Sequence, residues 1–232
     1  MLNDDLRGKI SGTLHLLSGE YGNPEWHSDG DALSVLVQTV LSQNTSDTNS
    51  SRAFKTLIST FPRWEDVADS DVRQIAAAIK PGGLANIKAL RIKQILEVIK
   101  QKYGNFNLDF LEDMSLNEAR QWLKNLPGVG EKTAACVLLF SLGRPALPVD
   151  THVHRVARRL GLIGARISAE KAHIELLQLV PPEYVYQFHV LSIEHGRLIC
   201  KARNPKCPVC VLRTICPADE KLRKGLTNNL SS

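Results

Sequence analysis

The 232-residue sequence predicts an all-α fold. Apolar residues recur at helical spacing (i, i+3, i+4, i+7) in several segments, and no long stretch shows the alternation expected of a strand. Glycine and proline punctuate the chain often enough to divide it into short helices. With 43% hydrophobic and 23% charged residues, the composition is that of a globular protein and excludes a wholly disordered one.

Three segments fit the helical template most clearly, 33–40, 92–99 and 172–180. Ser115 and Glu118 have the spacing of a capping box and predict that a helix begins there. No apolar stretch approaches the roughly 20 residues of a membrane-spanning helix, and the first residues have no secretory pattern. We therefore expect a protein without a membrane partner.

The charge is unevenly distributed along the chain. The net charge is +5, but residues 1–75 contain 6 basic and 11 acidic residues, whereas residues 76–232 contain 23 basic and 13 acidic ones. This asymmetry is consistent with a surface that binds a polyanion, and equally with a solvated basic face that has no partner.

A tight turn is predicted between two helices at Leu126-Pro127-Gly128-Val129-Gly130. The helix that follows, over 131–141, is apolar on nearly all sides and should be buried, with Cys136 as a small core residue. Amides at such a helix start attract phosphate, although a plain corner between two helices gives the same pattern.

Two residues near this turn can carry chemistry. Lys132 is either an ordinary exposed lysine or an amine nucleophile that forms a Schiff base. Asp150 can cap the following helix, and it can also place a carboxylate beside a sugar ring that develops positive charge. The two roles of Asp150 are compatible because one oxygen can cap while the other faces a pocket.

Four of the five cysteines lie within 17 residues, at Cys200, Cys207, Cys210 and Cys216. Four thiolates can bind a [4Fe–4S] cluster or a zinc ion. Because only Cys207 and Cys210 form a close pair, the spacing favours iron–sulfur over zinc. Basic residues that include Lys201 and Arg203 lie among these cysteines. They either contact a phosphate backbone or offset the charge of the cluster.

Taken together, these motifs resemble the endonuclease III family of helix-hairpin-helix DNA glycosylases with an iron–sulfur cluster. The resemblance rests on residues 126–134, on Val149-Asp150-Thr151-His152, on the C-x6-C-x2-C-x5-C spacing and on Leu41-Ser42-Gln43-Asn44-Thr45-Ser46-Asp47. It covers about residues 25–216. It implies two lobes, a six-helix barrel with the hairpin (25–144) and an iron–sulfur cluster lobe (1–24 and 145–232).

The resemblance also implies roles for single residues. Lys132 corresponds to the Schiff-base lysine, Asp150 to the catalytic aspartate and the four cysteines to the ligands of a [4Fe–4S] cluster. Residues Gly128, Val129 and Gly130 would bind DNA, as would Lys201 and Arg203 beside the cluster. Leu84 would be an apolar wedge. The family's gap-filling glutamine aligns with Asn44, so the sequence leaves open whether Asn44 or Gln43 fills the gap.

The implied function is base excision repair by a bifunctional DNA N-glycosylase and abasic-site lyase, with oxidised pyrimidines as the expected bases. The expected partner is double-stranded DNA with damaged bases or abasic sites, bound by a monomer. The expected location is the cytoplasm of a prokaryote, at the nucleoid. Two alternatives remain, a monofunctional glycosylase for a mismatch or another lesion, and a non-enzymatic DNA-binding protein with a structural metal.

Overall fold

The computed structural model describes residues 2–218. Over this range the chain contains helices and turns without any strand, which confirms the predicted all-α class. The chain divides into two compact units. His27–Arg144 form one, here the hairpin unit, and the residues up to Trp26 together with those from Pro145 onward form the other, here the cysteine unit. None of the helices described is both long and apolar enough to cross a membrane.

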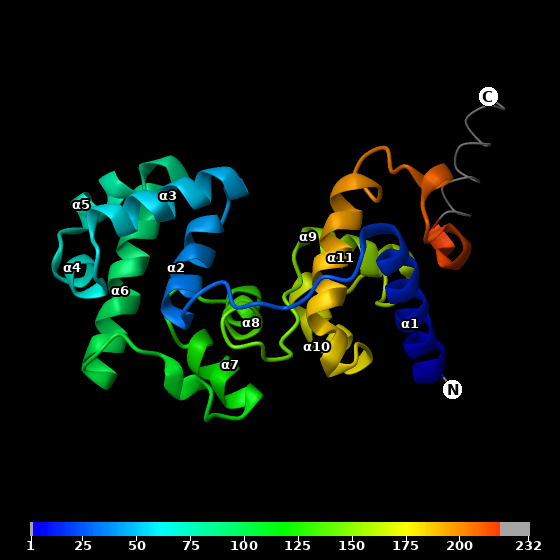
Figure 1. The fold of residues 1–232 in the computed structure, drawn as a ribbon, viewed down its shortest axis with the longest axis horizontal. Coiled ribbons are helices and arrows are strands. Elements are labelled where there is room, and N and C mark those ends of the chain that lie inside the picture. The colour runs from blue at the N-terminus through cyan, green and yellow to red at the C-terminus, as the bar shows by residue number, and fades with distance from the viewer. Residues whose placement is uncertain (1, 219–232) are drawn as a thin grey trace. The chain divides into compact units, whose positions relative to one another are not determined.

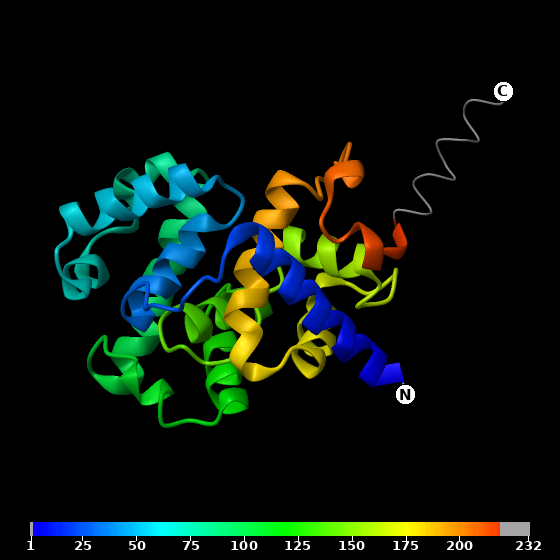
Figure 2. The same ribbon diagram turned by 45° about the vertical axis from the view of Figure 1, so that its right-hand side comes forward.

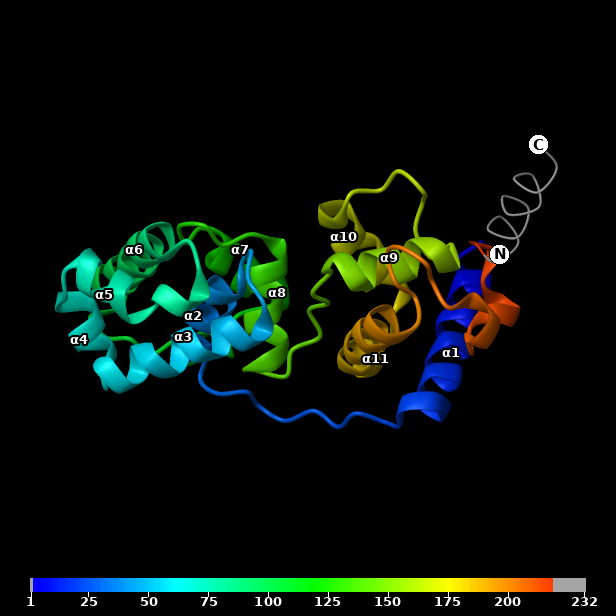
Figure 3. The ribbon, with the colours of Figure 1, turned by 90° about the horizontal axis from the view of Figure 1, so that it is seen from above.

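The hairpin unit is built around α2 (Ala32–Ser42), which packs against α3, α6 and α8 (Figure 3). Its other elements, labelled in Figure 1, are α3 (Asp47–Thr60), α4 (Trp64–Asp69), α5 (Val72–Ala78), the 3-10 turn η1 (Lys80–Gly82), α6 (Ala85–Tyr103), η2 (Asp109–Leu111), α7 (Leu116–Lys124) and α8 (Glu131–Phe140). The isoleucines of α6 on its inner stripe, Ile92, Ile95 and Ile99, are completely buried.

The cysteine unit joins both ends of the chain. Helix α11 (Val185–Leu198) packs against the N-terminal helix α1 (Leu2–Tyr21) and against α9 (Thr151–Leu160), as Figures 1 and 2 show. The remaining elements are α10 (Ala169–Leu179), η3 (Pro182–Tyr184), η4 (Cys207–Val209) and η5 (Arg213–Ile215). Apolar burial between α1, α9 and α11 forms the core of this unit.

The predicted helix starts are present. Ser115 accepts a hydrogen bond from the Glu118 amide, and the Glu118 carboxylate accepts one from the Ser115 amide, so the capping box that begins α7 is confirmed. The helix predicted over 131–141 is α8, and its residues from Thr133 to Leu139 are buried, Cys136 among them.

A tight turn connects α7 to α8. The Val129 amide donates to the Leu126 carbonyl at 3.2 Å, and Gly128 has a φ of 72°, in the left-handed region. Gly128 also touches a neighbouring helix, since a Cβ built on it would lie 2.0 Å from Nε of Arg91. Gly130 has no such neighbour within 4 Å. The turn therefore requires glycine at 128 but not at 130.

We expect Gly128→Ala to lower the free energy of unfolding by about 2 kcal/mol, because alanine adds left-handed strain and a collision with Arg91. Gly130→Ala, the matched control, should cost less than about 1 kcal/mol, the usual penalty for alanine at an N-cap. Urea denaturation of the two variants measures the difference. Equal stabilities would contradict this account of the turn.

Candidate active site and cysteine cavity

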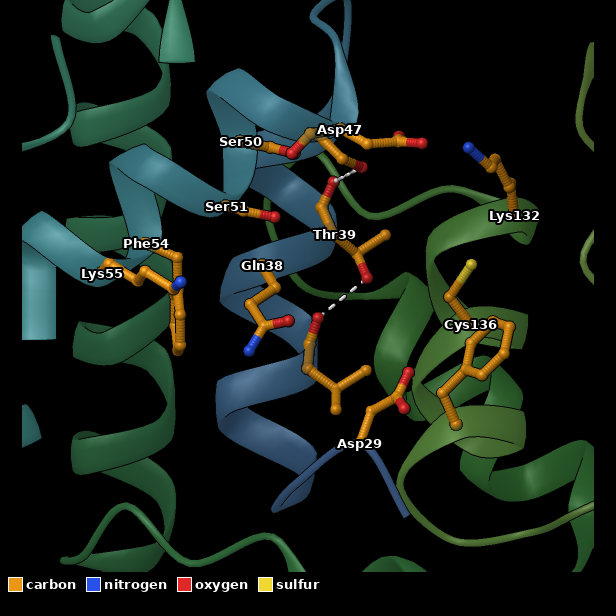
Figure 4. A pocket seen from close by; sticks show the side chains of 13 residues that line it. Asp29, Gln38, Thr39, Asp47, Ser50, Ser51, Phe54, Lys55, Lys132 and Cys136 are labelled. Carbon is orange, nitrogen blue, oxygen red and sulfur yellow. Dashed lines mark hydrogen bonds between the residues drawn. The ribbon is translucent and has the colours of Figure 1, made fainter. Parts of the chain in front are cut away.

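An open pocket of about 530 Å³ lies in the hairpin unit between α2, α3 and α8. Lys132 of α8 and Asp47 of α3 line it, and Figure 4 shows the amine and the carboxylate extending toward each other. The polar side chains of Gln38, Thr39 and Ser51 add hydrogen-bonding groups to the wall. The pocket thus combines a primary amine, a carboxylate and several neutral polar groups.

The position of Lys132 follows from the hairpin. Lys132 is the second residue of α8, so it comes directly after the turn and before the buried stretch of the helix. Its neighbour Glu131 forms ion pairs with Lys124 and Arg120 of α7, which join the two helices on either side of the turn. The backbone that carries the amine is therefore held from both sides.

The same turn leaves main-chain donors available. Gly130 is the N-cap of α8 and has no side chain that could accept from the first-turn amides. The first amides of a helix have no partner within the helix, and together with the helix dipole they favour an anion. The amides in the first turn of α8 therefore have no side-chain cap, whereas the Val129 amide is already bonded to the Leu126 carbonyl.

Sequence analysis assigned no role to Asp47, Gln38 or Thr39, although all three line the pocket. A signal was present, because Gln38, Thr39 and Ser42 place polar atoms in the second half of a mostly apolar helix. Asp47 stands in the quoted motif at the first position of α3, just after the N-cap Ser46. Which of these positions faces a pocket depends on α8, whose packing the local pattern does not specify.

Asp150 is the N-cap of α9 in the cysteine unit. Its Oδ1 accepts from the amides of His152 at 2.9 Å and Val153 at 2.7 Å. Both bonds use the same oxygen, so Oδ2 takes no part in the cap. The segment before Asp150 is held by two buried histidines, since Nδ1 of His173 donates to the Leu147 carbonyl and Nδ1 of His189 to that of Pro148, each at 2.8 Å.

Gln43 and Asn44 differ in their contacts. The Gln43 carbonyl oxygen accepts from Arg91 at 2.6 Å, and its amide donates to the Gly128 carbonyl and the Thr133 hydroxyl at 3.4 Å. Asn44 is exposed and has a φ of 54°. Gln43 is therefore bound to the hairpin and α6, whereas Asn44 projects from the turn.

Leu84 is the second residue with an unusual backbone. It precedes α6 with a φ of 49°, and its side chain is 51% exposed. A left-handed conformation costs a residue with a Cβ about 1–2 kcal/mol, and exposure of leucine forgoes the gain from burial. Strain of this kind persists where the surrounding structure imposes it, and it is common at binding sites.

All four clustered cysteines line one cavity in the cysteine unit. Most of its wall is apolar, with Leu160, Ile199 and Leu212 among the lining residues, and no acidic side chain of the described residues reaches it. Over residues 2–218, no three His, Cys, Asp or Glu side chains are arranged so that they could hold a metal ion. The donor set nevertheless fits an iron–sulfur cluster, because four soft thiols line a single, mostly apolar cavity.

The buried His195 connects this cavity to Tyr21. His195 Nε2 lies 3.4 Å from Sγ of Cys210, and its Nδ1 lies 3.0 Å from the Tyr21 hydroxyl. Burial lowers the pKa of His195 to about 4 and raises the pKa of Cys210 to about 11. Burial, with a smaller effect of Glu20, raises the pKa of Tyr21 to about 12.

Two arginines of α9 hold the loop that carries the first of these cysteines. Arg155 donates to the carbonyls of Cys200 and Gly196, and Arg159 donates to those of Lys201 and Ala202. The side chains of Lys201 and Arg203 are exposed on the same loop. Both side chains are therefore accessible to an anion in the solvent.

Comparison with known proteins identifies the family. Residues 37–182 match the family model described as HhH-GPD superfamily base excision DNA repair protein. Endonuclease III of Thermotoga maritima is 36% identical over 206 residues, which are 89% of this chain and 92% of that protein. A putative DNA glycosylase of Arabidopsis thaliana is 39% identical over 181 residues, 76% of this chain but only 62% of the longer plant protein.

Solved structures agree with these sequence relatives. A trapped endonuclease III–DNA covalent intermediate is 28% identical and superposes with a TM-score of 0.80 over 94% of this chain and 98% of that one. A thermostable thymine-DNA glycosylase is 25% identical, with a TM-score of 0.76 over 92% and 98% of the two chains. The chain therefore belongs to the HhH-GPD superfamily of base excision DNA repair proteins and, within it, to the endonuclease III family of DNA glycosylases.

Proposed function

We propose that this protein is a bifunctional DNA N-glycosylase and abasic-site lyase acting on damaged bases, chiefly oxidised pyrimidines, in double-stranded DNA. The observation that carries the proposal is the amine of Lys132, which enters a pocket directly behind the hairpin. The lyase reaction requires a primary amine that can form an imine, whereas a monofunctional glycosylase does not need an amine at this position. The DNA-bound state of the solved endonuclease III relative supports the choice of partner.

DNA is held through its phosphates. The open amides at the start of α8 bind one phosphate of the damaged strand. Lys201 and Arg203, exposed on the cysteine loop, add contacts that depend on salt and not on sequence. These contacts position the strand, and the damaged nucleotide is selected because an unpaired or poorly stacked base costs less to extrude.

Extrusion of a nucleotide leaves a gap in the duplex. We assign gap filling to Asn44 and not to Gln43, because the Gln43 amide is already bonded to Arg91 and the hairpin. Leu84, exposed and strained, is the apolar wedge that enters the opposite side of the stack. Both residues project from the hairpin unit, which also contains Lys132.

The chemistry begins at C1′ of the extruded nucleotide. The neutral Lys132 amine attacks C1′, the bond from C1′ to the base breaks, and the base leaves with the bonding electrons and takes up a proton. The lysine nitrogen gives one proton to a base, the bond from C1′ to the ring oxygen then breaks, and the ring oxygen takes up the second amine proton as the imine between C1′ and the lysine nitrogen forms. Asp150 stabilises the positive charge on the sugar and accepts a proton through the oxygen that is not in the cap.

The imine then allows strand cleavage. It acidifies the hydrogen on C2′, and loss of that proton drives the electrons toward the imine as the bond from C3′ to the phosphate oxygen breaks. The strand is thus cut on the 3′ side by β-elimination. Hydrolysis of the imine with one water returns Lys132 to its free form, so no external oxidant or reductant is consumed.

Cys200, Cys207, Cys210 and Cys216 would hold a [4Fe–4S] cluster. The cluster would supply structural order, because the segment from Cys200 to Cys216 contains only two 3-10 turns and buries few apolar side chains. Arg155 and Arg159 already hold the beginning of this segment. We further propose that the protein acts as a monomer on nucleoid DNA in the cytoplasm of a prokaryote; its similarity to the endonuclease III proteins of Thermotoga maritima and Bacillus subtilis supports a DNA repair role of the bacterial type.

Lys132→Gln should abolish both strand cleavage and the protein–DNA adduct that borohydride traps during turnover, because an amide cannot form an imine. Denaturing gels of duplexes with one oxidised pyrimidine or one abasic site measure both products. Lys100→Gln, which changes a partly exposed lysine of α6 that pairs with Asp69, is the control and should still trap. Strand cleavage by Lys132→Gln would overturn the assignment. Base release by wild-type protein that needs added alkali would instead establish the monofunctional alternative.

Asp150→Asn and Asp150→Ala separate capping from catalysis. Asparagine preserves the acceptor for the His152 and Val153 amides, so stability should stay within about 0.5 kcal/mol, whereas alanine should cost about 1 kcal/mol. Base excision should fall in both variants by about 10²- to 10⁴-fold, because both lack the carboxylate. Full activity in Asp150→Asn would show that Asp150 acts as a cap and nothing more.

Protein purified without oxygen should be brown and contain about four iron atoms per chain. Cys207→Ser should lose the colour and iron, while Cys136→Ala, in the core of the hairpin unit, should keep both. Iron analysis and visible absorption make the comparison. A colourless wild-type protein with one zinc ion per chain would contradict the iron–sulfur assignment and indicate a zinc site.

A further inference from the structure

Lys88 of α6 is buried although it is a lysine. Its side chain is only 2% exposed, and it is among the largest fully buried side chains of the protein. It occupies the same helical stripe as Ile92, Ile95 and Ile99, at spacings of four, seven and eleven residues. A cation on the core stripe of a helix is costly unless its donors are satisfied.

Two main-chain carbonyls satisfy those donors. Nζ of Lys88 donates to the Leu41 carbonyl at 2.6 Å and to the Gly82 carbonyl at 2.8 Å. Leu41 lies in the last turn of α2, where carbonyls lack helical partners and a cation is favoured. Gly82 ends η1 and packs closely on α3, since a Cβ at Gly82 would lie 3.0 Å from Cβ of Ala53. One side chain therefore joins the ends of two separate elements.

The chain leads from each of these carbonyls to a proposed gap-filling residue. Asn44 follows Leu41 by three residues, and Leu84 follows Gly82 by two. Asn44 and Leu84 both adopt left-handed backbone conformations, with φ of 54° and 49°. Lys88 thus hydrogen-bonds to the main chain just before each turn, at the Leu41 and Gly82 carbonyls.

Arg91, one helical turn further along α6, extends this connection to the hairpin. It donates to Gln43 and packs over Gly128, and Gln43 in turn donates to the Gly128 carbonyl. Arg91 also contributes, after burial, to lowering the pKa of Lys88. Lys88 and Arg91 of one helix are therefore bonded to the main chain before the turns at Asn44 and Leu84 and, through Gln43, to the hairpin.

We infer that Lys88 is a positioning residue that fixes the spacing between Asn44 and Leu84, so that both can enter the DNA stack while a nucleotide is extruded. This inference rests on the proposed function. Lys88 touches neither DNA nor the reacting atoms, and it acts through the two carbonyls. Its loss should impair steps that need gap filling and spare the imine chemistry at Lys132.

Lys88→Met tests the inference, because methionine fills similar space and donates no hydrogen bond. Two substrates are compared under single-turnover conditions, a duplex with one oxidised pyrimidine and a single-stranded oligonucleotide with one abasic site. The duplex requires extrusion and gap filling, whereas the single strand requires only the lysine chemistry. We expect a loss of at least about tenfold on the duplex and a change of less than about threefold on the single strand.

A fluorescent base gives a readout that a general loss of stability would not move. With 2-aminopurine placed opposite a stable abasic analogue, wild-type binding should raise fluorescence as the opposite base is unstacked. Lys88→Met at saturating protein should give a clearly smaller rise. Ile95→Ala, on the same helix, is the control for destabilisation and should affect the two cleavage substrates alike.

Gly82→Ala provides a second variant in case Lys88→Met does not fold. Its Cβ would press on Ala53 and displace the turn that carries Leu84, so the same selective loss on the duplex is expected, at smaller size. Proportional losses on both substrates, or unchanged activity on both, would overturn the role of Lys88. Wild-type protein that cleaves neither substrate would overturn the proposed function itself and with it the inference.

Discussion

Helix ends impose the constraint on which this structure depends, because the main-chain groups of the first and last turns have no partners within their own helix. The chain treats three such ends differently. Asp150 caps the start of α9 with one carboxylate oxygen, and Lys88 satisfies a carbonyl at the end of α2. At the start of α8, Gly130 supplies no side-chain cap, and in the proposed function those amides bind a phosphate. The proposed phosphate site is thus the helix end that no side chain of the protein caps.

Much of the fold follows from local pattern. The apolar spacing in 33–40 corresponds to the interior of α2, the spacing in 92–99 to part of α6, and Ser115 with Glu118 to the start of α7. These features are local because a hydrogen bond or a helical face depends on residues three or four apart. The cysteine spacing was informative for a chemical reason, since few structures need four thiols within one short segment.

The missed residues depend on contacts between distant parts of the chain. Lys88 bonds to Leu41, 47 residues earlier, and its position on the stripe of Ile92 and Ile95 was the available sign that it is no ordinary surface lysine. The choice between Gln43 and Asn44 could not be made from sequence either, because it turns on Arg91 and Gly128. Asp47 belongs to a recognised motif, but its place in a pocket depends on α8. Tertiary packing, and not local helix propensity, determines where each of these side chains lies.

The strained residues show why such packing matters for function. A left-handed conformation is unfavourable by about 1–2 kcal/mol for leucine or asparagine. A turn without restraining contacts would therefore leave that conformation. Bonds from a buried lysine to the adjoining carbonyls keep both turns in place before any ligand arrives. The unfavourable free energy of ordering these residues is then part of folding, where the core of the hairpin unit can offset it. It does not reduce the free energy of DNA binding. Lys88, which does not contact the substrate, can in this way lower the barrier to extruding a nucleotide. The side chains of Asn44 and Leu84, which take the place of that nucleotide in the stack, are already in position.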